Sequence, residues 1–253
     1  MASQSDYIAI FDSGVGGISV LKQLVKQMPN ERFLYFGDSA NAPYGTRSTQ
    51  EIQQLCIHVA EKLIAQGIKA LVVACNTATA AAVKLLRQRY PNLIIVGIEP
   101  AVKLAADTYP GGTVGVMATP VTLQEEKFRL LAQRCADRCS IVTLSAPGLA
   151  DLVEAGQGHS EESEALIRAL LDPWVGKLDA LVLGCTHYPF VTETLKKILG
   201  DTPLLDGSLG TAQETRRQLE KRGLLYEGPG EIIIQNSSLD PSLLRRSWEL
   251  LEE

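Results

Sequence analysis

The sequence predicts an α/β fold made of two similar open parallel-sheet lobes. Short apolar runs alternate with longer amphipathic segments along the 253 residues, the pattern of βα units that feed a parallel sheet. Two runs share the spacing Ala-Leu-Val-x-x-Cys and end at Cys75 and Cys185. A second pair, Ile8–Ser13 and Val114–Thr119, repeats at nearly the same offset, so we expect an internal duplication.

The apolar runs define the predicted strands, which are, in chain order, Tyr7–Phe11, Arg32–Phe36, Ala70–Ala74, Leu93–Ile98, Thr113–Met117, Ser140–Leu144, Asp179–Gly184 and Glu231–Gln235. Apolar residues at helical spacing predict helices over Ser19–Gln27, Thr49–Gln66, Ala78–Arg89, Val121–Arg134, Glu162–Leu171, Val191–Ile198 and Thr211–Arg222, and a last helix from Ser242. Most strands are thus followed by a helix, as parallel sheets require.

Glycine and proline mark two expected hinges, at Gly97–Pro100 and Asp206–Gly210. We therefore expect a first lobe from residues 1–97 plus 210–253, carrying Cys75, and a second lobe from residues 98–209, carrying Cys185. The segment after Gly210 offers a helix, a strand and a helix that could complete the first sheet. The expected active site is the cleft between the lobes.

Composition excludes some classes of binding partner and predicts the cell compartment. The formal charge of −5 and pI near 5.4 give no excess of Lys and Arg for nucleic acid or an anionic membrane. Five cysteines, an odd number in a chain of this length, indicate free thiols in a reducing compartment. The N-terminal residues are neither basic nor apolar, and no later run is long enough to span a bilayer, so we expect a soluble cytoplasmic protein.

Both repeated strands place a cysteine where open parallel sheets bind ligands, at the carboxyl end. Asn76 and Thr77 follow Cys75, and Thr186 and His187 follow Cys185. N–H groups at the start of the next helix can stabilise a thiolate, whose pKa is ordinarily about 8.5. The alternative is that each cysteine is a small buried hydrophobe. Because the two cysteines occupy equivalent positions and polar residues follow each of them, we favour the interpretation that both are reactive thiols.

Two loops that follow the first strands are candidate parts of the same site. In Asp12–Gly17 the glycines at 14, 16 and 17 let backbone N–H groups approach an anion, although the spacing does not match a dinucleotide fingerprint. A tight βα turn is the alternative. Gly37–Gly45 is rich in turn formers and could close over a ligand through Tyr44, but on its own it reads as an ordinary loop.

The remaining histidines and cysteines are weaker candidates. His58 and His159 are interpreted as surface or packing residues, whereas His187 could act as acid, base or thiolate partner. Cys135 and Cys139 have the spacing of a metal half-site, but no second pair completes a zinc set. We therefore predict that Cys135 and Cys139 bind no metal. The segment is interpreted as the end of a helix followed by a strand. Cys56 is expected in the core.

Four ordered motifs resemble the glutamate racemase family across essentially the whole chain: Ile10–Gly17 (IFDSGVGG), Tyr35–Gly45 (YFGDSANAPYG), Val73–Ala78 (VACNTA) and Leu183–Pro189 (LGCTHYP). The resemblance implies cofactor-independent interconversion of L- and D-glutamate, supplying D-glutamate for bacterial peptidoglycan, with no PLP, metal or nucleotide. It also implies a glutamate substrate, no nucleic acid or membrane partner, and a homodimer.

The resemblance further implies the roles of individual residues. Cys75 and Cys185 would be catalytic from opposite sides of the substrate's α-carbon, assisted by Asp12 and His187. The implied substrate-binding residues are Asp12, Ser13, Pro43, Tyr44, Gly45, Asn76, Thr77, Thr186 and His187, with Asp38, Glu154, Thr119 and Thr122 as supporting residues.

Racemisation removes a proton from one face of the α-carbon and returns one to the other, so a thiolate and a thiol on opposite faces can exchange roles. Without an electron sink such as PLP, N–H groups and hydroxyls around the carboxylate must stabilise the developing carbanion. Three alternatives stay open: a racemase for aspartate or another small amino acid, a non-catalytic two-lobed binding protein, and a thiol redox protein.

Overall fold

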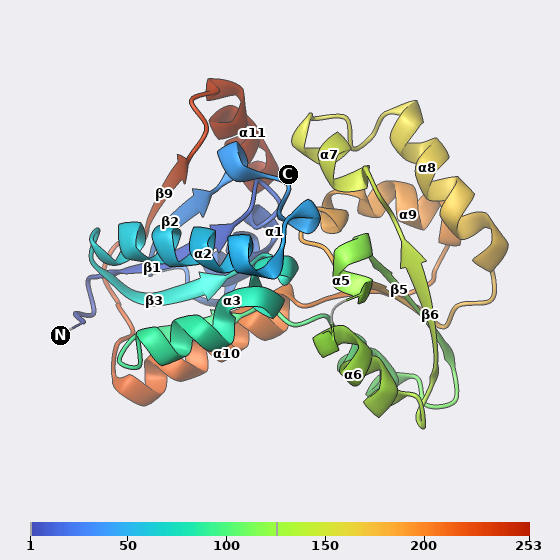
Figure 1. Ribbon diagram of the computed structural model, residues 1–253, viewed down its shortest axis with the longest axis horizontal. Helices are drawn as coiled ribbons and strands as arrows, with labels where there is room; N and C mark the ends of the chain where they lie inside the picture. Colours follow the sequence, from blue (N-terminus) through green and yellow to red (C-terminus); the bar gives the residue numbers. More distant parts are fainter. Residues whose placement is uncertain (1, 125) are drawn as a thin grey trace. The chain divides into compact units, whose positions relative to one another are not determined.

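The computed structural model describes residues 2–124 and 126–253, in which the strands form two parallel sheets (Figure 1). The first sheet has the order β4-β3-β1-β2-β9 and the second the order β6-β5-β7-β8. Their bounds are β1 Tyr7–Asp12, β2 Arg32–Gly37, β3 Ile68–Val73, β4 Ile94–Gly97, β5 Thr113–Ala118, β6 Ser140–Ser145, β7 Ala180–Leu183, β8 Leu204–Asp206 and β9 Glu231–Asn236. The predicted α/β class with two parallel sheets is confirmed.

The chain divides into two units, each with its own sheet and core. Unit 1 consists of residues 2–99 and 208–253, and unit 2 of the described residues between 100 and 207. Unit 1 is therefore made from two separate stretches of chain. The C-terminal stretch returns to pair β9 with β2 in parallel, as the sequence predicted for the segment after Gly210.

The two sheets share a strand order that agrees with the repeat in the sequence. The first sheet without β9 reads β4-β3-β1-β2, and the second, read from its other edge, reads β8-β7-β5-β6. Each strand of one sheet thus has a counterpart in the other, with β3 corresponding to β7 and β1 to β5. Cys75 and Cys185 follow β3 and β7 at equivalent positions, beyond the carboxyl ends of both strands.

Amphipathic helices cover the sheets. In unit 1 they are α1 Ile18–Gln27, α2 Thr49–Ile64, α3 Asn76–Arg89, α10 Ser208–Arg222 and α11 Pro241–Glu252. In unit 2 they are α4 Val102–Thr108, α5 Pro120–Gln124, α6 Glu126–Cys135, α7 Leu149–Glu154, α8 Glu161–Leu171 and α9 Thr192–Leu199. Single 3-10 turns lie at Ser39–Asn41, Tyr44–Thr46, Asp172–Trp174 and Tyr188–Val191.

The helices pack beside the strands that precede or follow them. Figure 1 shows α2 and α3 side by side, and α1 contacts both α10 and α11. The packing of α1 joins the two separate stretches of unit 1. None of the helices in residues 2–124 and 126–253 combines the length and apolar character needed to cross a bilayer.

Several elements differ from the sequence prediction. The helices α4 and α7 and the short strand β8 were not predicted, and the helix expected over Val121–Arg134 is described as α5 and α6, with residue 125 outside the described part. The helix expected from Thr211 begins at Ser208, so Gly210 lies inside α10. Ser208 and Thr211 are buried there, and this packing outweighs the poor helix propensity of Ser and Gly.

A buried ion pair joins distant parts of unit 1 at the amino end of its sheet. Lys69 Nζ lies 2.6 Å from Glu31 Oε2, and both side chains are almost fully buried. The ammonium also donates to the carbonyl oxygens of Gln4 and Leu224, at 2.6 and 3.0 Å. Glu31 Oε1 accepts the N–H of Tyr226 at 2.9 Å. The pair therefore ties the first residues, two strands and the returning C-terminal stretch together.

Candidate active site

Cys75 lies in the βα turn between β3 and α3 and caps the helix. Its backbone is extended while Asn76 begins α3, so its Sγ accepts the N–H of Ala78 at 3.4 Å. Ser13 Oγ donates to the same sulfur at 3.5 Å. The side chain is 6% exposed. Two donors on one sulfur at a helix N-terminus favour the thiolate form.

Asp12 and Ser13 reach this position because β1 lies beside β3 in the sheet. Asp12 ends β1, is fully buried, and accepts the N–H of Gly14 through Oδ1 at 3.0 Å. The start of α1 approaches so closely that a Cβ on Gly17 would lie 2.6 Å from the Cβ of Asp12. Glycine is needed at 17 because of this close approach. The motif is thus a rigid turn that also presents two polar side chains.

Asp38 and Tyr44 form a second polar group in unit 1, on the loop after β2. Tyr44 Oη donates to Asp38 Oδ2 at 2.6 Å, and Asn41 Nδ2 donates to both carboxylate oxygens. Burial and the adjacent carboxylate raise the pKa of Tyr44, so its hydroxyl remains a donor. Tyr44 belongs to the same buried cluster as Cys56 and Cys75. The loop that the sequence alone left ambiguous therefore packs, through Tyr44, into the cluster that contains the thiol.

The other predicted unit 1 residues flank this group. Asn76 and Thr77 are buried in the first turn of α3, Pro43 is exposed, and a Cβ on Gly45 would meet nothing within 4 Å. The Oδ1 atom of Asn76 is buried and has no hydrogen-bond partner among the described residues. A buried acceptor without a donor costs free energy, so this atom is available to a ligand's N–H group.

Cys185 has a different environment in unit 2. Its Sγ lies 3.5 Å from His187 Nδ1, and His187 Nε2 lies 2.6 Å from Glu154 Oε1. Burial alone would lower the pKa of His187, but Cys185 and Glu154 reverse this and raise it well above 6.5. The imidazolium form can donate to Glu154 at one nitrogen and to the sulfur at the other. The three residues form a chain of acid and base groups.

Three threonines complete the predicted set in unit 2. Thr186 is buried beside Cys185. Thr119 follows β5, the counterpart of β1, so it occupies the place that Ser13 has in unit 1. Its Oγ1 lies 3.0 Å from Thr122 Oγ1 and accepts the Thr122 N–H at 3.3 Å. The structure describes nine of the predicted residues in unit 1 (Asp12, Ser13, Asp38, Pro43, Tyr44, Gly45, Cys75, Asn76 and Thr77) and six in unit 2 (Thr119, Thr122, Glu154, Cys185, Thr186 and His187).

The histidines and cysteines that the sequence analysis left out of the site are surface or core residues, although Cys56 shares a buried cluster with Tyr44 and Cys75. His58 and His159 are exposed, and Cys56 is buried in α2, as predicted. Burial raises the pKa of the Cys56 thiol, which keeps it protonated. Cys135 ends α6 and Cys139 precedes β6, so the prediction of a helix end followed by a strand is confirmed.

Two polar residues that hold the candidate site residues or loops of unit 1 were missed by sequence reasoning. Asn41 binds both oxygens of Asp38, and Tyr35 donates from the sheet to the carbonyl oxygen of Gly14 at 2.6 Å. Asn41 lies within a motif already singled out, so its amide could have been paired with Asp38 from turn chemistry. Tyr35 begins the same motif, but its strand reads as an ordinary buried run, so no site role was assigned to it.

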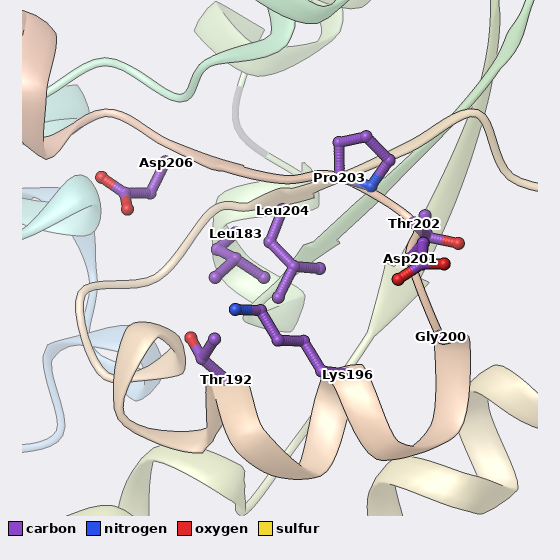
Figure 2. Close-up of a pocket in the computed structure, with 9 residues that line it drawn as sticks. All are labelled: Leu183, Thr192, Lys196, Gly200, Asp201, Thr202, Pro203, Leu204 and Asp206. Carbon is purple, nitrogen blue, oxygen red and sulfur yellow. The ribbon is translucent and has the colours of Figure 1, made fainter.

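A cavity of about 550 Å³ lies elsewhere on unit 2, between α9 and the strands β7 and β8 (Figure 2). Leu183 and Leu204 line it, and Figure 2 shows the ammonium of Lys196 directed toward them. Asp201 and Asp206 also line it. Cys185 and His187 do not, so this cavity is distinct from the thiol's surroundings.

Comparison with known proteins identifies the family. Residues 12–215 match the model of the Asp/Glu/hydantoin racemase family. A glutamate racemase of Clostridium acetobutylicum is 46% identical over 255 residues, covering 100% of both chains.

Solved structures agree with this assignment. The glutamate racemase of Francisella tularensis in complex with D-glutamate aligns with a TM-score of 0.84 at 28% identity, covering 99% of this chain and 95% of the other. The Escherichia coli glutamate racemase in complex with L-glutamate and the activator UDP-MurNAc-Ala aligns with a TM-score of 0.84 at 30% identity, covering 97% and 92%. Four motifs, two matching sheets and full-length similarity lead to one conclusion: the chain belongs to the Asp/Glu/hydantoin racemase family, among the glutamate racemases.

Proposed function

We propose that this protein interconverts L- and D-glutamate without a cofactor and supplies D-glutamate for peptidoglycan synthesis. The observation that carries the proposal is the pair of thiols at equivalent ends of two matching sheets, each with its own polar partners. The names of the full-length relatives and the glutamate enantiomers bound to two similar structures support the choice of substrate.

In the proposed mechanism, Cys75 and Cys185 act on opposite faces of the substrate's α-carbon. One thiolate removes the α-proton and the opposing thiol donates a proton to the other face, after which the two have exchanged protonation states. Asp12 and His187 assist the sulfurs on their respective sides. Exclusion of water would strengthen every hydrogen bond to the carboxylate as negative charge builds up.

One substrate contact is assigned from an unpartnered buried atom, and the others from polar groups close in sequence or space to the two thiols. The unpartnered Asn76 Oδ1 suits the α-ammonium group, since it is a buried acceptor next to Cys75. The hydroxyls and N–H groups of Ser13, Thr77 and Thr186 suit the carboxylates. We place Tyr44, Gly45 and Pro43 along the substrate, with Asp38 fixing the Tyr44 hydroxyl and Glu154 fixing His187. Thr119 and Thr122 are assigned a supporting role.

The two sides are chemically unequal. Cys185 is coupled to a buried imidazolium and a carboxylate, whereas Cys75 has a hydroxyl and a backbone N–H as donors. The imidazolium can supply or hold a proton, but the donors at Cys75 only stabilise its charge. We infer that Cys185 and Cys75 reach their reactive forms by different routes.

The decisive experiment follows both optical rotation and α-deuterium content in deuterated water, without added PLP or metal. L-glutamate should lose rotation and gain deuterium together. Cys75→Ala and Cys185→Ala should each lower kcat/KM by about 10²- to 10⁴-fold, the usual contribution of a general acid or base. Cys139→Ala, a buried cysteine outside both groups, is the matched control. Full racemisation by either active-site variant would refute the two-thiol mechanism.

The same assay separates the alternatives. Faster exchange with L-aspartate than with L-glutamate would indicate a different substrate, and tight glutamate binding with no exchange would indicate a binding protein. A thiol redox function predicts that oxidant removes two titratable thiols, Cys75 and Cys185, as a disulfide. We also propose a cytoplasmic homodimer, which sedimentation of the purified chain would test.

A further inference from the structure

The C-terminal strand β9 ends beside the loop that carries Asp38. Its register with β2 places Asn236 opposite Gly37, and Gly37 is in turn opposite Asp12. Asp12, Gly37 and Asn236 thus form a row across the carboxyl ends of β1, β2 and β9. A Cβ on Gly37 would lie 2.6 Å from Gly14 O and 2.9 Å from Asn236 Nδ2, so the three strand ends are closely packed.

Two side chains from this strand end hold the neighbouring loop through hydrogen bonds. Asn236 Nδ2 donates to Ser39 Oγ at 2.9 Å, and Ser237 Oγ accepts the N–H of Ala40 at 3.0 Å. The N–H of Ser237 also donates to Gly37 O at 2.9 Å. The two side-chain contacts each join residues 197 apart in the sequence. We call Asn236 and Ser237 the C-terminal clamp.

The loop held in this way leads directly to the thiol of unit 1. Ser39 and Ala40 lie in the 3-10 turn Ser39–Asn41, which directly follows Asp38, and the Asn41 side chain donates to the Asp38 carboxylate. Asp38 also accepts the hydroxyl of Tyr44, which packs in the cluster that contains Cys75. A shift of the 3-10 turn would therefore move Asp38 and Tyr44 relative to the sulfur.

We propose that Asn236 and Ser237 are positioning residues for the Cys75 side of the racemase site. They do not touch the sulfur; they fix the turn that fixes Asp38 and Tyr44. The inference rests on the proposed function, because positioning is defined by the proton transfer at Cys75. It assigns a functional role to a strand that none of the four sequence motifs includes.

The test uses Asn236→Ala, Ser237→Ala and the double variant in the full-length chain. Ser237→Thr keeps the accepting hydroxyl and should restore activity. Ser238→Ala is the matched control, since the Ser238 hydroxyl accepts the N–H of Asp240 in the same segment without contacting the loop. Thermal midpoints are measured for every variant. We expect the single variants to lose about three- to tenfold in kcat, as for one positioned hydrogen bond.

Two readouts separate positioning from general destabilisation. In deuterated water, slow reprotonation at Cys75 gives the Cys185 thiol, which holds the abstracted proton, more time to exchange it for deuterium before returning it to the original face. Deuterated but unracemised substrate should therefore accumulate from the enantiomer that Cys185 deprotonates and not from the other. Iodoacetamide should alkylate Cys75 several-fold faster than in the original protein, with the rate at Cys185 unchanged, as judged by mass spectrometry of peptides.

The outcomes are distinguishable. Three results would each refute the positioning role of Asn236 and Ser237. They are unchanged kcat and alkylation rates in the double variant, an equal loss of kcat in Ser238→Ala, and equal changes in alkylation rate at both cysteines. Alkylation of Cys75 does not depend on turnover, so it tests the clamp even if the unmodified chain fails to exchange the α-proton of glutamate, a failure that would instead overturn the proposed function.

Discussion

His187 is held between a thiol and a carboxylate, and this position fixes its charge. Glu154 stabilises the imidazolium, so Glu154→Gln should lower the pKa of His187. If catalysis at Cys185 uses the imidazolium, the alkaline limb of the kcat/KM profile should move to lower pH. Glu162→Gln, an exposed glutamate at the start of α8, should leave the profile in place. An unmoved alkaline limb in Glu154→Gln would rule out the imidazolium as the group that titrates there.

The same residue links stability to pH. The pKa of His187 is raised by folding above its ordinary 6.5, so its contribution to stability is complete below that value and is lost as the pH rises through the folded-state pKa. The Glu154→Gln variant should therefore lose less stability over that rise than the original protein. Denaturant unfolding at a series of pH values would show the difference.

At the scale of elements, the contact between β1 and α1 depends on the absence of a side chain at position 17. Gly17→Ala would force the new Cβ against Asp12 and Ala74, at 2.6 and 3.1 Å, where neither partner is the flexible end of a long side chain. We expect a loss of about 1–3 kcal/mol in the free energy of unfolding, together with reduced racemisation.

The matched control for Gly17→Ala is Gly210→Ala. Gly210 lies in helix α10 with nothing within 4 Å of a new Cβ. Alanine there should stabilise the chain by up to about 1 kcal/mol, because glycine is a poor helix former. Urea unfolding of both variants checks the opposite signs, and equal destabilisation would contradict the steric argument.

The strands were predictable because apolar runs and β-branched residues report burial on both faces of a parallel sheet. Elements with weaker patterns were missed: β8 has three half-buried residues, and α4 follows Pro100 without a distinct cap. The thiols and Asp12 were found because polar residues directly follow strands. Asn236 and Ser237 do the same, so that rule could have found them. Their contact with Ser39 and Ala40 could not be predicted, since it depends on β9 pairing with β2.

At the scale of the molecule, the buried Lys69–Glu31 pair fixes the discontinuous unit 1 at the end of the sheet away from the thiol. Burial lowers the pKa of Lys69, and four hydrogen bonds, three donated by Lys69 and one accepted by Glu31 from Tyr226, compensate for the desolvation of the pair. Lys69→Met would leave Glu31 buried without its counter-ion. We expect about 3–5 kcal/mol of destabilisation in urea unfolding.

Two further variants test this interpretation. Lys26→Met removes an exposed lysine at the end of α1 and should cost less than about 1 kcal/mol. The double variant Lys69→Met, Glu31→Leu should recover much of the loss, because replacing a whole buried pair with apolar groups is often nearly neutral. A double variant as unstable as Lys69→Met would point to the hydrogen bonds with Gln4, Leu224 and Tyr226 as the larger contribution.

The return of the chain from unit 2 to unit 1 has a consequence for biosynthesis. A ribosome makes all of unit 2 before it makes β9, which completes the first sheet and supplies Asn236 and Ser237. Unit 2 can therefore fold while unit 1 still lacks its edge strand. During synthesis the surroundings of Cys185 are finished first, and those of Cys75, although encoded earlier, are finished last. In a nascent chain the surroundings of Cys75 thus wait for β9 and the residue after it, long after Cys75 itself has been made.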